Sequence, residues 1–292
     1  MPGRIRVKTI AAVIALVVAV AAGLGAGYLF WGRATDWYAV KNPETLPASA
    51  ENDLIRYGRD LVVDTAAHIG RGTADPALAY AGNDLDCTNC HINAGLKPFA
   101  APFVSTYASY PLMVGDTVTT LPERINGCMT RSLNGRPMPE DGREMEAIIA
   151  YIRYLGTGTP EGVRVAGMGL MPLEPPAEAP SATRGEATFK TTCVRCHGED
   201  GQGTLDVPPL WGERSFNQAA GLADRRMAAA FIRANMPWGI TYLDPLLSEQ
   251  QAWDLAAPPA RPVGGELGRT GAGAMLPPPS PDRCPEPARF GR

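Results

Sequence analysis

The sequence carries the pentapeptide CTNCH at residues 87–91 and a second one, CVRCH, at residues 193–197. A Cys-x-x-Cys-His motif is the attachment signature of c-type haem. Each thiol forms a thioether with a haem vinyl group, and the histidine supplies the proximal nitrogen to the iron. The residues that would hold the haems are Cys87, Cys90, His91, Cys193, Cys196 and His197. The two motifs therefore predict two covalently bound haem c groups.

A zinc site is the alternative interpretation of the same residues. The two motifs take up four of the six cysteines and two of the three histidines, and cysteine and histidine are also the usual zinc ligands. Zinc motifs seldom end each cysteine pair in Cys-His, so we favour haem.

Length and composition fit two small haem domains. A chain of 292 residues suggests about two domains with appendages. The net charge of −3 gives no indication of nucleic-acid binding. The 28 prolines and 32 glycines suit domains in which loops wrap a haem that forms much of the core. The predicted fold is mainly α: two cytochrome c-type haem domains in tandem, preceded by an N-terminal transmembrane helix.

The N-terminus has the pattern of a membrane anchor. Arg4, Arg6 and Lys8 precede an uncharged run at residues 9–32. About 20 apolar residues span a bilayer as a helix, and the cationic end stays in the cytoplasm. We therefore expect residues 1–33 to anchor the chain in the inner membrane, with the rest on the periplasmic side, where haem c is attached. The alternative is a cleaved signal peptide, which would leave a soluble periplasmic protein.

Breaks in the apolar pattern give the domain boundaries. The predicted segments are a stalk at 34–50, a first haem domain at 51–156, a linker at 157–182, a second haem domain at 183–257 and a disordered tail at 258–292. Apolar residues recur at helical spacing near both ends of the first domain. Gly58 lies on the apolar face of its opening helix, where it would let the helix at residues 144–155 cross closely. Gly185 and Phe189 repeat the Gly58 and Val62 spacing in the second domain, so the two halves look like diverged copies.

The residues alone leave the distal ligand of the first haem open. Met138 precedes a proline just before the closing helix, which is the usual place for a thioether ligand. Cys128 lies between the haem motif and that helix, and a thiolate would lower the haem potential where a thioether raises it. His68, the remaining histidine, precedes a glycine-rich turn and is better explained as a surface residue.

For the second haem, Met236 is the predicted distal ligand, because it follows a helix that ends at residue 234. Met227 is a weaker candidate. Met168 and Met171 lie in the linker, where methionines usually serve packing.

Several blocks resemble the dihaem thiosulfate dehydrogenase family. They are CTNCHINAGLKPF at residues 87–99, Tyr110-Pro111, ERINGC at 123–128 and RSLNG at 131–135. The resemblance implies that Cys128 is the distal ligand of the catalytic haem, with Met138 as the alternative. It also implies oxidation of thiosulfate to tetrathionate, with electrons leaving through a His197/Met236 haem to an acceptor c-type cytochrome or a terminal oxidase. A membrane-anchored dihaem carrier without its own substrate, or a cytochrome subunit of a partner dehydrogenase, remain the alternatives.

The resemblance further implies basic groups that hold thiosulfate, a dianion. Arg124, Cys128 and Ser132 are spaced four apart, so a helix would put them on one face, and the guanidinium fork of Arg124 suits an oxyanion. The chain departs from the family at residues 112–120, which lack the second arginine expected there. Lys97 is a possible substitute.

Two further departures concern the second half. Asn235 stands where some family members have a lysine that exchanges with the methionine, so we predict steady His/Met ligation. A helix that begins after Ser248 stops at Pro258-Pro259, and the tail composition is what a shifted reading frame would give. Cys284 lies in this tail, where a pairing with Cys128 is a remote alternative.

Overall fold

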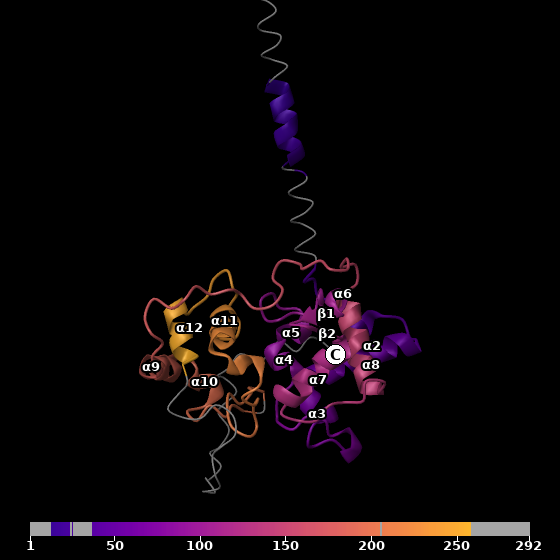
Figure 1. Cartoon of the computed structure of the whole chain (residues 1–292), viewed down its shortest axis with the longest axis vertical. Helices are drawn as coiled ribbons and strands as arrows, with labels where there is room; N and C mark the ends of the chain where they lie inside the picture. The colour runs from indigo at the N-terminus through magenta and orange to yellow at the C-terminus, as the bar shows by residue number, and fades with distance from the viewer. Residues whose placement is uncertain (1–12, 24, 26–36, 205, 258–292) are drawn as a thin grey trace, which may run out of the picture. The chain divides into compact units, whose positions relative to one another are not determined.

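The computed structural model describes residues 13–23, 25, 37–204 and 206–257 (Figure 1). The chain divides into two units after Val40. In the first unit residues 13–23 are helical, and within the described residues no helix is both long and apolar enough to cross a membrane. Most of the predicted anchor at residues 1–33, and the predicted tail with Cys284, lie outside the described residues.

The second unit is mainly α-helical, which confirms the predicted class. A short antiparallel hairpin pairs strand β1 (Leu112–Val114) with strand β2 (Thr117–Thr119). The hairpin fills the stretch that lacks the expected second arginine, and it exposes the apolar side chains of Met113, Val114 and Val118.

The first lobe, residues 41–156, is built on two crossed helices, α2 (Ala50–Val63) and α8 (Arg143–Leu155). Ser49 begins α2 by accepting a hydrogen bond from the amide of Asn52 at 3.2 Å. As predicted, Gly58 permits the close crossing, because a Cβ atom there would lie 1.9 Å from the carbonyl oxygen of Ala147. The core includes Leu61, Val62, Met145, Ile148, Ile152 and Leu155.

Short elements complete this lobe. They are η1 (Pro43–Thr45), α3 (Thr65–Ile69), η2 (Pro76–Leu78), α4 (Cys87–Cys90), α5 (Ile92–Gly95), α6 (Thr106–Ser109) and the longer α7 (Leu121–Arg131). Part of the predicted stalk contacts this lobe, since Lys41 donates to the carbonyl of Leu155 at 2.5 Å.

The second lobe, residues 182–257, repeats the plan with fewer elements. They are α9 (Ala182–Thr192), α10 (Val194–His197), η3 (Gly221–Ala223), α11 (Arg225–Asn235) and α12 (Glu249–Leu255). Helices α9 and α12 pack together, and a Cβ atom at Gly185 would lie 2.1 Å from the carbonyl oxygen of Asp254. The predicted equivalence of Gly58 and Gly185 is therefore visible in the packing.

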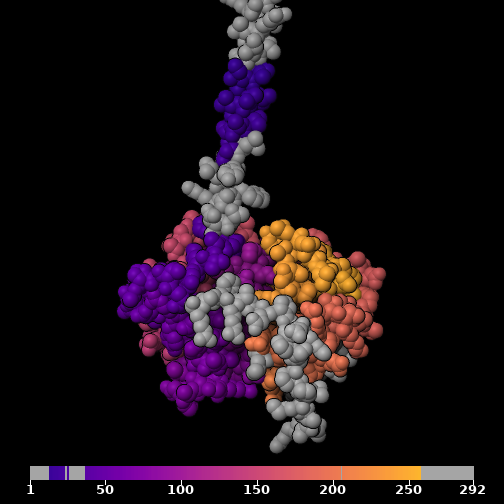
Figure 2. All heavy atoms as spheres, turned by 180° about the vertical axis from the view of Figure 1, so that it is seen from behind, coloured from indigo at the N-terminus to yellow at the C-terminus, as the bar shows by residue number. Residues whose placement is uncertain are grey.

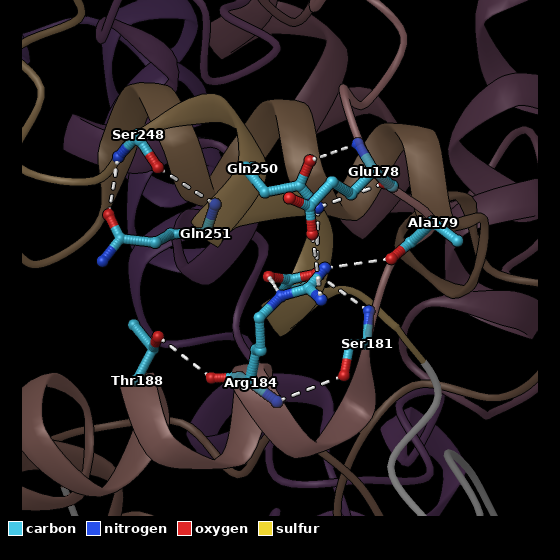
Figure 3. A network of polar contacts seen from close by, with 9 residues as sticks. Glu178, Ala179, Ser181, Arg184, Thr188, Ser248, Gln250 and Gln251 are labelled. Atoms are coloured by element: carbon cyan, nitrogen blue, oxygen red, sulfur yellow. Dashed lines mark hydrogen bonds and ion pairs between the residues drawn. The ribbon is translucent and has the colours of Figure 1, made fainter.

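An ion pair between Arg184 and Asp254 links the two crossed helices of the second lobe, α9 and α12. Figure 3 shows Arg184 reaching from α9 toward α12. Its guanidinium donates to both carboxylate oxygens of Asp254, at 2.7 and 2.8 Å. Asp254 is buried and also accepts from the amide of Ser181 and from Gln250. These hydrogen bonds outweigh the effect of burial, which acts to raise the pKa, and hold the pKa of Asp254 below its usual value.

The linker pairs with the first lobe. The amides of Phe99 and Ala101 donate to the carbonyls of Gly167 and Gly169, at 2.6 and 2.9 Å. The two lobes are in contact with each other, and their orange and purple surfaces adjoin in Figure 2. An apolar cluster at this contact is made of Ile92, Ala100, Leu170, Leu222, Phe231 and Met236.

Candidate haem sites and catalytic centre

Both motif histidines are oriented by a backbone carbonyl. The Nδ1 atom of His91 lies 2.6 Å from the carbonyl oxygen of Ala101, and that of His197 lies 3.1 Å from the carbonyl oxygen of Pro208. An Nδ1–H that donates to a carbonyl leaves the Nε2 lone pair for a metal. Burial lowers the pKa of His91 to about 4 and also lowers that of His197. Both shifts favour the neutral ring, which is the form that binds iron.

The first motif is held at its start by three residues, Thr65, Asp86 and Asn89, that were not predicted as site residues from the sequence. Thr65 is buried, and its hydroxyl accepts from the amide of Cys87 at 3.0 Å. Asp86 accepts from the amide of Ala66 at 2.8 Å, and Asn89 accepts from the amide of Asp86 at 2.7 Å. The spacing of Asp86 and Asn89 is a capping pattern that could have indicated the short helix α4.

The structure brings Cys128 close to the first motif. It lies on α7, which begins with a capping box between Thr120 and Glu123. Before any haem is attached, burial raises the pKa of the Cys87 and Cys90 thiols to about 12, and the nearby Cys128 acts in the same direction. Cys128 is half-buried and carries a free thiol. It is thus available to a metal bound beside these thiols.

Arg124 belongs to the same cluster. Its positive charge acts to lower the pKa of His91, after the larger effect of burial. Burial raises the pKa of Tyr110, while Arg124 opposes this through its charge and a hydrogen bond. Arg124 is exposed and Tyr110 is half-buried, so a solvent-accessible guanidinium lies next to Cys128 and the first motif. The Tyr-Pro block was the sequence signal for Tyr110, but its contact with Arg124 is a finding of the structure.

Met138, the alternative ligand, is tied to the same helix. It is buried, and Asn126 of α7 bonds both of its backbone groups: Oδ1 accepts from the amide at 2.8 Å and Nδ2 donates to the carbonyl at 2.9 Å. Asn126 therefore fixes the loop that carries Met138 beside the helix that carries Cys128.

The other predicted residues are distributed as follows. Ser132 directly follows α7 as its C-cap, and its carbonyl accepts from Asn83 at 2.9 Å. Lys97 donates to the carbonyl of Ile240 in the second lobe at 3.1 Å, so its ammonium is engaged by the second lobe. His68 is exposed, with its ring edge-on to Tyr57, which agrees with a surface role.

In the second lobe, Met236 directly follows α11 and is half-buried in the apolar cluster between the lobes. Met227 is 42% exposed, which makes it the poorer candidate ligand. Arg233 of α11 has a buried Nε atom without a hydrogen-bond partner, as expected of a group that would meet a bound anion such as a haem propionate.

The zinc alternative finds no support in the described residues, where no group of three or more Cys, His, Asp or Glu side chains could hold a metal ion. Each lobe instead offers paired thiols next to one neutral, oriented imidazole. These donor sets fit c-type haem.

A cavity of about 600 Å³ opens beside the Arg124 cluster. Tyr110 forms part of its wall, together with Thr120 and Leu121 at the start of α7. Arg124 follows one turn later, so it lies over the same side of the helix. The remaining wall includes Arg153, whose guanidinium stacks on Tyr107 at 5.6 Å.

Two Cys-x-x-Cys-His motifs, each with its histidine bonded to a carbonyl in a lobe of crossed helices, are the features of a c-type cytochrome. A family model described as cytochrome C oxidase, cbb3-type, subunit III, matches residues 180–257. Thiosulfate dehydrogenases are similar over most of the chain. That of Thiomonas intermedia is 37% identical and that of Stutzerimonas stutzeri 35%; the matches cover 73% and 77% of this chain, and 67% and 72% of theirs. The chain belongs to the thiosulfate dehydrogenase family of oxidoreductases, as its sequence blocks predicted.

A solved structure agrees with this assignment. The thiosulfate dehydrogenase (TsdBA) of Marichromatium purpuratum matches with a TM-score of 0.67 and 35% identity. The match covers 74% of this chain and 47% of that one, so the present chain spans about half the length of the solved protein.

Proposed function

We propose that the protein oxidises thiosulfate to tetrathionate at a haem held by His91 and Cys128. Two thiosulfate dianions form one sulfur–sulfur bond and release two electrons. A second haem, held by His197 and Met236, takes part in passing these electrons to an acceptor c-type cytochrome or a terminal oxidase. The observation that carries the proposal is the cluster of Cys128, Arg124 and Tyr110 beside the first motif.

The choice of Cys128 over Met138 is supported by its surroundings. Cys128 lies close enough to both motif thiols to act electrostatically on them, and this nearness supports its choice as the ligand. It also has the exposed Arg124 one helical turn away. A carrier haem needs no such cation, whereas a site for a dianion does.

Cys128, Arg124 and Tyr110 have different roles in the proposed reaction. The haem supplies the electron acceptor, and the Cys128 sulfur adjusts its potential. Arg124 holds the dianion through its guanidinium fork and offsets the repulsion between two anions. Tyr110 keeps Arg124 in place through their hydrogen bond. The cavity along Tyr110 and Thr120 is the proposed substrate entrance; its wall carries one cation, Arg153, and one carboxylate, Glu161.

We further propose that the protein works on the periplasmic side of the inner membrane. Covalent haem attachment takes place outside the cytoplasm, and residues 9–32 have the length of an anchor. Removal of this segment as a signal peptide would give the same compartment with a soluble protein. Comparing the mass of the mature N-terminus with that of the full sequence distinguishes the two.

The test replaces each candidate sulfur ligand in the holoprotein. Cys128→Ala should abolish thiosulfate-dependent reduction of ferricyanide while haem content stays at the wild-type level. Met138→Leu is the matched control, since it changes a buried sulfur on the same helix–loop unit and should retain turnover. If Met138→Leu abolishes the Met-type spectrum of the first haem and wild-type protein does not turn over thiosulfate, the protein is a dihaem carrier without its own substrate.

A further inference from the structure

A buried asparagine lies between the two haem sites. Asn235 ends α11, is fully buried and immediately precedes Met236. Its Nδ2 atom donates to the carbonyl of Phe231 on its own helix and to the carbonyl of Phe99 in the first lobe, both at 3.1 Å. Its Oδ1 atom is buried without a hydrogen-bond partner. An unpaired buried oxygen is unfavourable, so this position carries a cost that the two hydrogen bonds of Nδ2 must offset.

The segment Phe99–Ala101, to which Asn235 is hydrogen-bonded, has a strained backbone. Phe99 and Ala101 have φ values of 58° and 48°, in the left-handed region that side chains other than glycine seldom adopt. Such a conformation persists only where its surroundings hold it. The linker holds the amides of both residues through Gly167 and Gly169, and Asn235 holds the carbonyl of Phe99 from the opposite side.

The same segment orients the proximal histidine of the first haem site. The carbonyl of Ala101 lies 2.6 Å from Nδ1 of His91. A continuous series of contacts therefore runs from Asn235 through Phe99 and Ala101 to His91. At the second haem site, Met236 comes one residue after Asn235. Its amide donates to the carbonyl of Ile232 at 2.9 Å.

Two more contacts from the loop after Met236 reach this segment. Lys97 donates to the carbonyl of Ile240, and the ring of Phe99 packs edge-on against Tyr242 at 4.6 Å. The loop that carries the predicted ligand of the second haem is thus fastened to the residues that orient the ligand of the first.

We propose that Asn235 is a positioning residue that couples the distal side of the second haem to the proximal side of the first. The inference rests on the proposed ligand pairs but not on the identity of the substrate. A carbonyl that accepts from Nδ1 makes the imidazole more basic and favours ferric iron. Removing the bond from Asn235 to Phe99 would loosen the Phe99–Ala101 segment and weaken the hydrogen bond between Ala101 and His91. The potential of the first haem would then rise, although Asn235 belongs to the second lobe.

The test measures the two haem potentials by spectropotentiometry of purified holoprotein without thiosulfate. Asn235→Leu, which keeps the approximate shape but removes both donors, should raise the potential of the His91 haem and speed amide hydrogen exchange in residues 97–101. Asn235→Ala, which removes the amide without adding a charge, is the second variant should the leucine variant not accumulate. Asp84→Asn is the control: it weakens the exposed contact with Arg214, 3.5 Å away across the lobes, without touching this segment.

An unchanged potential of the His91 haem in both Asn235 variants would overturn the proposal, as would an equal shift in Asp84→Asn. Turnover of thiosulfate by the wild type is measured separately. A wild type without turnover would refute the proposed function, while the comparison of potentials would still decide the role of Asn235.

Discussion

The two lobes share one scaffold but differ in the helix that carries each proposed distal ligand. Each crosses two helices over a glycine, and each orients its motif histidine with a carbonyl 10 or 11 residues further along. Between the motif and the closing helix, the first lobe has α7, which carries Arg124 and Cys128. The second lobe has α11 in this place, which ends at Asn235 and is followed by Met236. The parts of the two lobes that orient the motif histidines are thus nearly equivalent, and under the proposed function the difference in chemistry comes from α7 and α11.

The difference also shows in what surrounds each helix. Helix α7 lies beside a cavity and carries an exposed cation. Helix α11 is buried against the linker and the first lobe through Ala229, Ala230 and Phe231. A site that admits substrate needs the first arrangement, and a haem that only exchanges electrons suits the second.

The largest effect is expected from making the first lobe resemble the second. Cys128→Met should lower thiosulfate turnover by at least roughly 100-fold and raise the potential of the first haem by on the order of 0.1 V, since axial ligands span about 0.8 V. Steady-state assays and redox titration measure the two effects. Turnover that survives together with a raised potential would show that the thiolate is not needed for the chemistry.

Arg124 tests whether the first lobe holds an anion. Arg124→Gln should lower kcat/KM for thiosulfate by roughly 10- to 100-fold, because a hydrogen bond to a charged group contributes about 1.5–3 kcal/mol. Arg131→Gln is the matched control, since Arg131 is exposed on the same helix and donates to the carbonyl of Gly127 at 2.8 Å. Equal losses in both variants would indicate a general effect of charge instead of a clamp.

The helix crossings test how alike the two scaffolds are. Gly58→Ala and Gly185→Ala should each destabilise their own lobe by about 3 kcal/mol or more, since the added methyl group meets backbone oxygen. Gly72→Ala, where nothing lies within 4 Å, should change little. Thermal unfolding followed at each haem measures this. A mild effect at one crossing would mean that its helices can separate without losing the fold.

The sequence predicts the parts of this comparison that depend on local pattern. The Cys-x-x-Cys-His motifs, the helical apolar spacing around Gly58 and Gly185, and the helix that carries Cys128 are all readable in this way. The sequence cannot predict contacts with backbone groups far away in the chain, because every residue has a carbonyl and the residue type does not show which carbonyl is bonded. The bond from Asn235 to Phe99 and the pairing of the linker with Ala101 are of this kind. Lys97 shows the same limit: its charge suggested an anion clamp, yet its ammonium bonds a carbonyl of the other lobe.

The smallest effect is expected from the polar contacts, which differ between the two helix crossings. The first crossing has a hydrogen bond from the Tyr57 hydroxyl to Glu144 at 3.2 Å, where the second has the Arg184–Asp254 pair. The pKa of Asp254 is held below its usual value, so the ionised carboxylate stabilises the second lobe at pH values above about 3.9, the usual aspartate pKa. This contribution is lost as the pH falls from there toward the lowered pKa of the folded state.

Asp254→Asn should therefore lower the unfolding midpoint of the second lobe by several degrees at neutral pH and flatten its loss of stability in acid. Hydrogen exchange in α9 and α12, followed between pH 6 and pH 3, measures the difference. Glu178→Gln is the control, because the Glu178–Arg184 pair at 3.3 Å is exposed, and exposed pairs contribute little. If the first lobe lost stability in acid as steeply as the second, the buried carboxylate of Asp254 would not be what distinguishes the two crossings.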